Sequence, residues 1–186
     1  MYAFLLWNLF LAWIPYWLSL FLQRKYREAP KKAGFFVATF VWLLFFPNAL
    51  YIITDFIHLR PRGITPLWFD LILILSFAWT GLLLGFVSLQ TVHEIVARHW
   101  NAMTGWLFAF AVLFLSSFGI YIGRFLRWNS WDIVFNPVAL LSDMFDRVLN
   151  PLIHPRTYGM TLMLFLFFSV AYVTVIRLRL HRPSPK

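Results

Sequence analysis

A stripe of polar side chains runs through an otherwise apolar stretch of the chain. Asn48, Tyr51, Asp55 and His58 follow one another at spacings i, i+3, i+7 and i+10. A helix places residues at these spacings on one face. Because polar groups are unfavourable against lipid, we expect this face to turn towards the interior of a helical bundle.

Asp55 and His58 are one helical turn apart, so their side chains can meet. A carboxylate beside an imidazole orients the ring, and the pair could act as a general base with its orienting acid. The pair could also supply two metal ligands. An ion pair or a helix cap at the membrane interface is the alternative interpretation, and the sequence leaves both open.

Two further charged residues are expected near the same membrane face. Asp70 follows a short loop and lies just inside the next apolar segment, so it can converge with Asp55 and His58. These three residues would hold a divalent metal such as zinc, with an open position for water. Arg124 would pair with one of the acids or bind a phosphate or carboxylate of a substrate. Asp70 also fits a first-turn acid favoured by the helix dipole.

The remaining polar residues expected at this face are candidate substrate contacts. They come from the stripe and from the segment after Arg124, and they are Asn48, Tyr51, Arg127, Asn129 and Asp132. The convergence of several segments predicts a polar pocket that opens towards the outer leaflet. Trp128 and Trp131, in the same segment, are also typical of an interfacial aromatic belt.

The composition indicates a membrane protein. Of 186 residues, 61% are hydrophobic and 12% are charged, whereas soluble domains carry about 45–50% and about 25%. Segments of about 20 apolar residues can span a bilayer as helices. Five such segments occur, at about 3–22, 33–58, 67–95, 103–126 and 158–176. They predict an all-α integral membrane bundle, with residues 1–186 forming a single transmembrane domain.

Two further patterns concern helix surfaces. Residues 137–148 carry apolar side chains at helical spacing with polar residues between them, which predicts a short amphipathic helix on the outer surface. An ordinary loop helix packed on the bundle is the alternative. The pairs Gly81/Gly85 and Gly119/Gly123 predict close helix packing inside the bundle, with a dimer interface as the alternative.

The charge distribution predicts an orientation and excludes some classes. The formal net charge is +9, and basic residues concentrate in the first loop and the C-terminal tail. The positive-inside rule therefore places the N-terminus outside and the C-terminus in the cytoplasm. We interpret the charge as contact with anionic membrane lipids rather than with nucleic acid. The chain has no cysteine, which excludes disulfides and thiolate sites.

Several short blocks carry a family resemblance. They are Phe46-Pro47-Asn48-Ala49, Thr54-Asp55, His58-Leu59, Trp68-Phe69-Asp70 and the segment from Arg124 to Asp132. Together they resemble the DUF1361 family of bacterial membrane proteins, over roughly Leu5 to Phe168. The resemblance implies a multi-pass protein of the bacterial inner membrane. The family has no known function, so the resemblance implies no reaction.

Three functions fit these observations. One is a metal-dependent hydrolase acting on a lipid or lipid-linked substrate at the outer leaflet. A second is a carrier for a small polar solute or ion, with a path through Gln90 and His93 towards the inner face. A third is an accessory subunit, either self-associating as a homo-oligomer or bound to a membrane partner.

Overall fold

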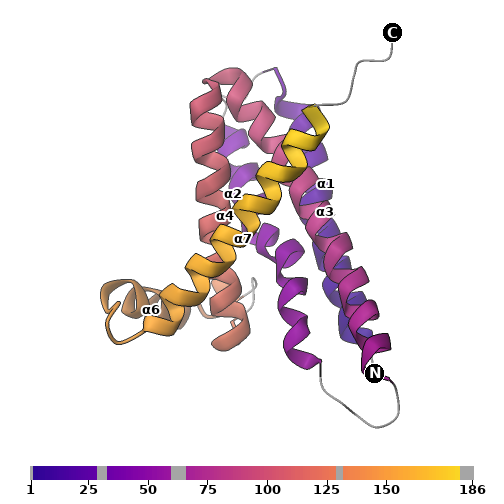
Figure 1. The fold of residues 1–186 in the computed structure, drawn as a ribbon. Coiled ribbons are helices and arrows are strands. Elements are labelled where there is room, and N and C mark those ends of the chain that lie inside the picture. Colours follow the sequence, from indigo (N-terminus) through magenta and orange to yellow (C-terminus); the bar gives the residue numbers. More distant parts are fainter. Residues whose placement is uncertain (1, 29–32, 60–65, 129–131, 181–186) are drawn as a thin grey trace. The chain divides into compact units, whose positions relative to one another are not determined.

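The structure is a computed structural model that describes residues 2–28, 33–59, 66–128 and 132–180. All regular secondary structure in these ranges is helical (Figure 1). The chain forms two compact units, Met1–Trp106 and Leu107–Lys186.

The first unit contains three long helical elements. They are α1 (Ala3–Tyr26), α2 (Ala33–Tyr51) with its 3-10 continuation η1 (Ile52–His58), and α3 (Leu67–His99). The first turn of α4 (Ala102–Phe125) also belongs to this unit. Helix α1 packs against both α2 and α3, and η1 packs against α3.

In the first unit, α1 and α3 run in the same direction and α2 runs in the opposite one (Figure 1). The starts of α1 and α3 meet where Tyr2 bonds to Asp70. The start of α2 meets the end of α3, where the rings of Phe35 and Trp100 lie 6.4 Å apart. The unit therefore has two ends. We call the one with Asp55 and Asp70 the acidic end, and the one with Arg24, Lys25 and Arg98 the basic end.

The middle of the first unit is closely packed. The Trp42 and Phe46 side chains are fully buried, with ring centroids 4.8 Å apart. The Trp42 indole N–H donates to Ser88 Oγ at 2.8 Å, and Ser88 Oγ–H donates to the carbonyl of Pro15 at 2.8 Å. This chain of bonds joins all three helices where lipid offers no partner for polar groups.

Two glycines let α3 approach α2 closely. A Cβ at Gly81 would lie 2.7 Å from the Ala49 carbonyl oxygen and 2.8 Å from Ile52 Cδ1. At Gly85 it would lie 3.1 Å from Leu50 Cδ2. The predicted role of this glycine pair in close packing is confirmed. For Gly119 and Gly123 it stays a prediction.

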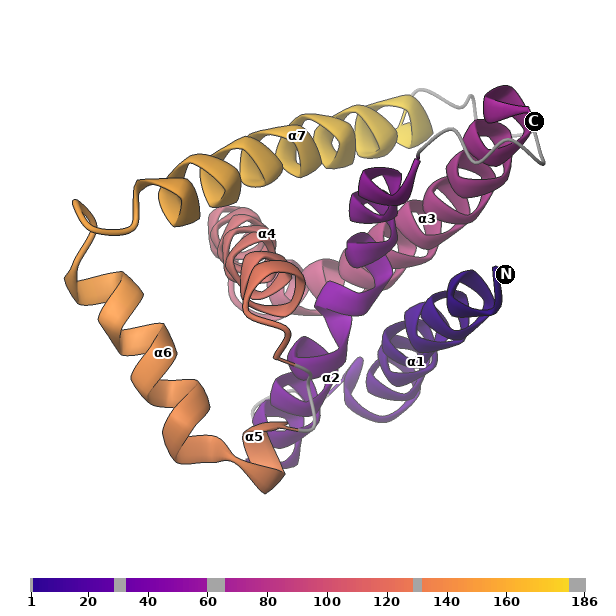
Figure 2. The same ribbon diagram turned by 90° about the horizontal axis from the view of Figure 1, so that it is seen from below.

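The second unit contains the rest of α4, α5 (Asp132–Phe135), α6 (Pro137–Leu149) and α7 (Pro155–Leu180). Figure 2 shows α6 joining α5 to the start of α7. Phe165 of α7 packs edge-on against Phe110 and Phe114 of α4, with centroids 6.4 and 5.7 Å apart. The amphipathic helix was predicted at 137–148, whereas α5 was not predicted.

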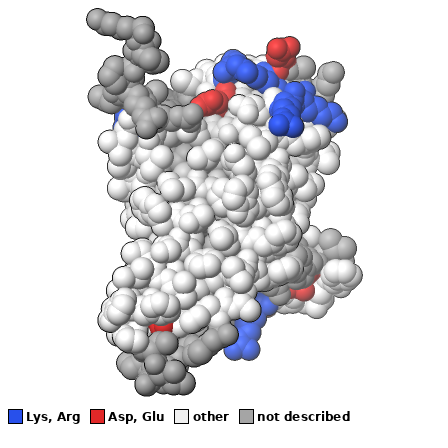
Figure 3. Space-filling model, turned by 90° about the vertical axis from the view of Figure 1, so that its right-hand side faces the viewer, with Lys and Arg blue, Asp and Glu red and all other residues white. Residues whose placement is uncertain are grey.

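Within the part of the chain that the structure describes, five helices are long and apolar enough to cross a membrane. They are Ala3–Tyr26, Ala33–His58, Leu67–His99, Ala102–Phe125 and Pro155–Leu178. They confirm the predicted all-α class and the five predicted spans. In Figure 3, uncharged side chains cover most of the described part of the face shown.

Candidate functional site at the acidic end of the first unit

Asp55 is buried at the acidic end, with 1% of its surface exposed. It lies in η1, where the backbone of α2 tightens into a 3-10 helix after Tyr51. The Thr54 hydroxyl donates to the Tyr51 carbonyl at 2.7 Å within this turn. The Asn8 side-chain amide of α1 donates to Asp55 Oδ2 at 2.9 Å. The expected inward orientation of Asp55 is therefore confirmed.

Asp70 is also buried, with 4% of its surface exposed. It lies in the first turn of α3, where the helix dipole favours a carboxylate. The Tyr2 hydroxyl donates a hydrogen bond to Asp70 Oδ1. Both buried acids thus accept a hydrogen bond from the N-terminal part of the chain, from Tyr2 just before α1 and from Asn8 within it.

The other residues of the polar stripe have different surroundings. His58 is exposed, and its ring meets the edge of Phe4 with centroids 5.5 Å apart. The prediction that the whole stripe faces inwards is therefore wrong for His58, because η1 reaches the surface there. Asn48 is half-buried and donates to the carbonyl of Phe45 in its own helix at 3.0 Å. Tyr51 is half-buried as well.

The predicted metal site needs Asp55, His58 and Asp70 together. Within the described ranges, no three His, Cys, Asp or Glu side chains are grouped so that they could hold a metal ion. Asp55 accepts a hydrogen bond from Asn8 of α1 and Asp70 accepts one from Tyr2 just before α1, and His58 lies at the surface. This arrangement corrects the prediction of a three-ligand zinc site.

Comparison with protein families decides the identity of the chain. A family model described as "Protein of unknown function (DUF1361)" matches residues 7–173. The chain belongs to the DUF1361 family. No curated protein and no solved structure matches it. With its five candidate spans, the DUF1361 chain is a multi-pass membrane protein.

Sequence reasoning missed the two residues near the N-terminus that bond to the buried acids of the DUF1361 chain. Tyr2 and Asn8 lie in or beside the first apolar segment. Asn8 carried a usable signal, because a polar side chain inside a span usually finds a partner within the protein. Their acceptors lie 68 and 47 positions away along the chain, so no local spacing pointed to them.

The other predicted site residues of the DUF1361 chain belong to the second unit. Arg124 lies in the last turn of α4 and is half-buried. Arg127 is exposed and adopts a positive φ of 62°, at the turn after α4. Asp132 begins α5 and is half-buried. Asn129 lies outside the described residues. The convergence of these residues with Asp55 stays a prediction.

The basic end of the first unit holds the residues of the predicted carrier path. The Gln90 side-chain amide donates to Glu94 Oε1 at 2.9 Å. His93 is buried, and its ring meets the edge of Trp106 with centroids 4.9 Å apart. The closely packed Trp42 layer lies between this end and the acidic end. The geometry of the first unit therefore gives no support to a path joining the two.

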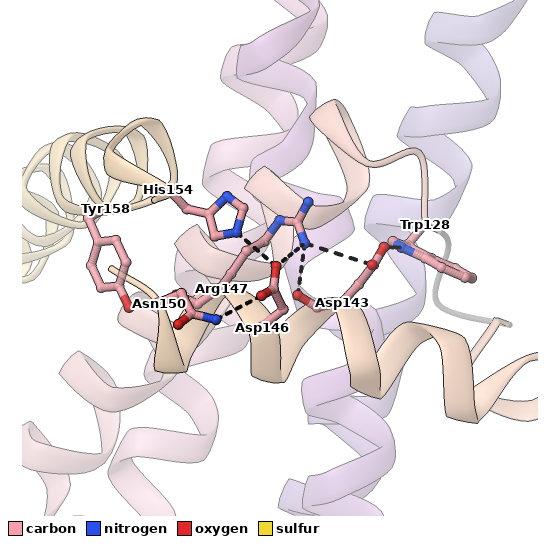
Figure 4. Close-up of polar contacts among 7 residues, drawn as sticks. All are labelled: Trp128, Asp143, Asp146, Arg147, Asn150, His154 and Tyr158. Carbon is pink, nitrogen blue, oxygen red and sulfur yellow. Dashed lines mark hydrogen bonds and ion pairs between the residues drawn. The ribbon is translucent and has the colours of Figure 1, made fainter. Parts of the chain in front are cut away.

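A second polar cluster lies around α6 (Figure 4). Arg147 Nη1 donates to the Asp143 carbonyl at 2.9 Å and lies 3.8 Å from Asp143 Oδ1 and 3.9 Å from Asp146 Oδ2. Asp146 also contacts His154 Nε2 at 2.8 Å and accepts from Asn150 at 2.8 Å. We call these five residues the α6 network. The hydrogen bonds from Asn150 and His154 lower the pKa of Asp146.

Two aromatic residues connect the α6 network to its neighbours (Figure 4). The Trp128 indole N–H donates to Asp143 Oδ2 at 2.8 Å. The Tyr158 hydroxyl, in the first turn of α7, donates to the Arg147 carbonyl at 2.8 Å. These bonds attach α6 to the segment before it and to the helix after it.

Proposed function

We propose that this DUF1361 protein is a non-catalytic accessory subunit of the bacterial inner membrane, whose α1 docks against a transmembrane helix of a partner protein. One observation carries the proposal. A row of exposed aromatic side chains follows one face of α1 along most of its length. We call this row the aromatic ladder, and it consists of Trp7, Phe10, Trp13, Trp17 and Phe21.

The rings of the aromatic ladder contact one another. Trp7 stacks on Phe10 at 5.7 Å, and Trp13 lies 5.9 Å from Trp17. Phe10 meets Trp17 edge-on at 6.4 Å. Trp7, Phe10, Trp13 and Trp17 therefore form a continuous aromatic surface, and Phe21 extends the exposed row. Tryptophan is among the residues that contribute most to binding at protein interfaces.

The depth of two ladder residues favours a protein partner over lipid. Trp13 and Trp17 are near the middle of α1, roughly 13–21 Å from either end at about 1.5 Å per residue. Tryptophan prefers the head-group region, where its ring N–H can bond. Acyl chains offer no hydrogen-bond acceptor at mid-depth. A partner helix would supply acceptors and ring contacts there.

The acidic end supports this proposal by fixing α1. On the face of α1 opposite the ladder, Asn8 donates to Asp55 and the Pro15 carbonyl accepts from Ser88, and Tyr2 just before α1 donates to Asp70. Because both carboxylates are buried in these contacts, they act here as positioning residues. Their effect is to hold the aromatic ladder in one orientation.

The charges of the first unit support a membrane orientation. The basic end carries Arg24, Lys25, Arg27 and Arg98, all exposed. The positive-inside rule assigns such an end to the cytoplasm. The acidic end would then face outwards, with the N-terminus outside and the C-terminus inside.

Site-specific photo-crosslinking in native membranes tests the proposal. A photoreactive amino acid at Trp17 should give one discrete adduct with a different protein. The matched control is Trp79, a similarly exposed tryptophan on α3, which should give lipid adducts alone. Lipid adducts alone at Trp17 would overturn the proposal. An adduct of twice the chain's own mass would show that the ladder binds a second copy of this chain, which would overturn docking to a different protein.

A variant pair adds a functional readout. Trp13→Leu with Trp17→Leu should abolish stoichiometric co-purification of the crosslinked partner, while Trp79→Leu should retain it. Retained co-purification in the double variant would contradict docking through the ladder. Turnover of a lipid substrate by the purified chain alone would contradict a non-catalytic role.

A further inference from the structure

Helix α6 exposes a wide apolar face outside the five candidate spans. Phe145 is 60% exposed, and its neighbours on this face are exposed as well. At helical spacing these residues share one side of the helix. We call this set the α6 apolar face, and it consists of Val138, Leu141, Phe145, Val148 and Leu149. Phe135 before the helix and Leu152 and Ile153 after it are also exposed.

The opposite side of α6 is already engaged. Asp143, Asp146 and Arg147 form the α6 network with His154, and Trp128 bonds to Asp143 (Figure 4). These contacts fix the rotation of α6 about its own axis. The apolar face is therefore presented outwards by the fold of this connection.

The connection keeps α6 at the level of the membrane surface. It joins two candidate spans, Ala102–Phe125 and Pro155–Leu178. The C-terminal turn of α6 touches the start of the second span, because Tyr158 donates to the carbonyls of Arg147 and Val148 at 2.8 and 3.1 Å. An apolar face held at this level meets the boundary between head groups and acyl chains.

We infer that α6 is an interfacial helix whose apolar face inserts into the lipid of the outer leaflet. The assignment to the outer leaflet rests on the orientation proposed above, whereas insertion itself does not. The α6 apolar face would contact lipid at the boundary between the glycerol groups and the acyl chains of the bilayer. The α6 network holds two carboxylates and one arginine, so the polar side carries no excess of positive charge that would attract anionic head groups. Insertion should therefore not depend on anionic lipid.

Spin labels give a direct measure of insertion, because the chain has no cysteine. The full chain carrying Phe145→Cys or Val148→Cys is labelled and reconstituted in phosphatidylcholine vesicles. The control is Asn136→Cys, an exposed residue at the start of α6 whose side chain makes no cap bond. At 145 and 148 we expect the label to collide with oxygen more than with a water-soluble nickel complex. At 136 we expect the label to collide with the nickel complex more than with oxygen.

Each other outcome overturns the inference. A label at 145 that collides mainly with the nickel complex shows that α6 lies in water. A label that neither probe reaches shows that protein covers the apolar face. Insertion that appears after phosphatidylglycerol is added, and is absent without it, shows binding to anionic head groups instead. In the background Phe145→Asp, the label at 148 should move towards water, and an unchanged label would contradict insertion.

A separate measurement isolates the choice of leaflet. On intact cells, a membrane-impermeant thiol reagent should react with Asn136→Cys from outside. If the reagent reacted only once the cells were permeabilised, the outer-leaflet assignment and the proposed orientation would be overturned. The depth measurement at 145 and 148 would still decide insertion on its own.

Discussion

At the scale of single residues, the hydrogen bonds that Asp55 and Asp70 accept explain why these two acids are buried. A carboxylate removed from water needs hydrogen-bond donors to offset its lost hydration. Asp55 accepts a hydrogen bond from the side-chain amide of Asn8, and Asp70 accepts one from the hydroxyl of Tyr2. Each acid is thus coupled to the position of α1, which makes the acids positioning residues for the aromatic ladder.

The contribution of one of these bonds can be measured. Asn8→Ala removes a donor to Asp55 Oδ2, and a hydrogen bond to a charged group contributes about 1.5–3 kcal/mol. We expect the free energy of unfolding in detergent micelles to fall by about this amount. The control is Thr174→Ala, because the exposed Thr174 hydroxyl bonds to Val170 of its own helix. Equal stability of the two variants would contradict a coupling of α1 to Asp55.

The pKa of Asp146 predicts a pH dependence at α6. Hydrogen bonds from Asn150 and His154 lower this pKa from its ordinary 3.8, and the charge of Arg147 acts in the same direction. A carboxyl with a lowered folded-state pKa stabilises the fold fully above its unfolded-state pKa. The stabilisation is lost as the pH falls through the lowered value.

We therefore expect the contacts of Asp146 to persist from neutral pH down to about pH 4 and to be lost below it. The mobility of a spin label at Val148→Cys should rise in this acidic range. In the background Asp146→Asn, the mobility should already be raised at neutral pH and should change little on acidification. The same acid transition in both backgrounds would assign it to another group.

At the scale of elements, the approach of α3 to α2 depends on a missing side chain. Gly81→Ala would place a methyl group against the Ala49 carbonyl oxygen and Ile52 Cδ1. Backbone cannot move aside easily, and overpacking costs typically about 1–3 kcal/mol. We expect a loss of stability of this size in detergent micelles.

A matched glycine controls for the change in helix propensity. Gly159 lies in α7, and a Cβ there would meet nothing within 4 Å. Gly159→Ala should be neutral or stabilising, because alanine is the better helix former by about 1 kcal/mol. If both substitutions had the same effect, close packing at Gly81 would not explain the loss.

The elements differ in how far sequence alone predicts them. The five spans follow from apolar length, which is a local property, and all five are present. Their ends were less accurate, since α3 continues to His99 beyond the predicted residue 95. The change to a 3-10 helix at Ile52 was not predicted, because helical spacing continues in the sequence up to His58. Helix α5 has four residues, too few for a periodic signal.

The candidate site was predictable only where a local property of the sequence determines a residue's surroundings. The burial of Asp55 follows from the cost of a carboxylate against lipid. The same argument fails for His58, whose depth depends on where η1 meets the surface. The donors Tyr2 and Asn8 could not be predicted, because their contacts depend on how α1 packs against the other helices.

At the scale of the whole molecule, the described Lys and Arg side chains of the first unit lie towards one of its ends. Exposed Arg24, Lys25 and Arg98 lie at one end, and buried Asp55 and Asp70 lie at the other. Basic residues next to a span are retained on the cytoplasmic side during insertion. The charge asymmetry therefore predicts which end reacts with reagents outside the cell.

Single cysteines at the two ends test this orientation in a chain that has none of its own. On intact cells, a membrane-impermeant maleimide should label His58→Cys at the acidic end. Arg98→Cys at the basic end should react after permeabilisation alone, and both residues are exposed, so access within the protein does not limit either reaction. The reverse pattern would contradict the orientation. The aromatic ladder and the α6 apolar face would then still bind a partner helix and lipid, because their chemistry does not depend on which side is cytoplasmic.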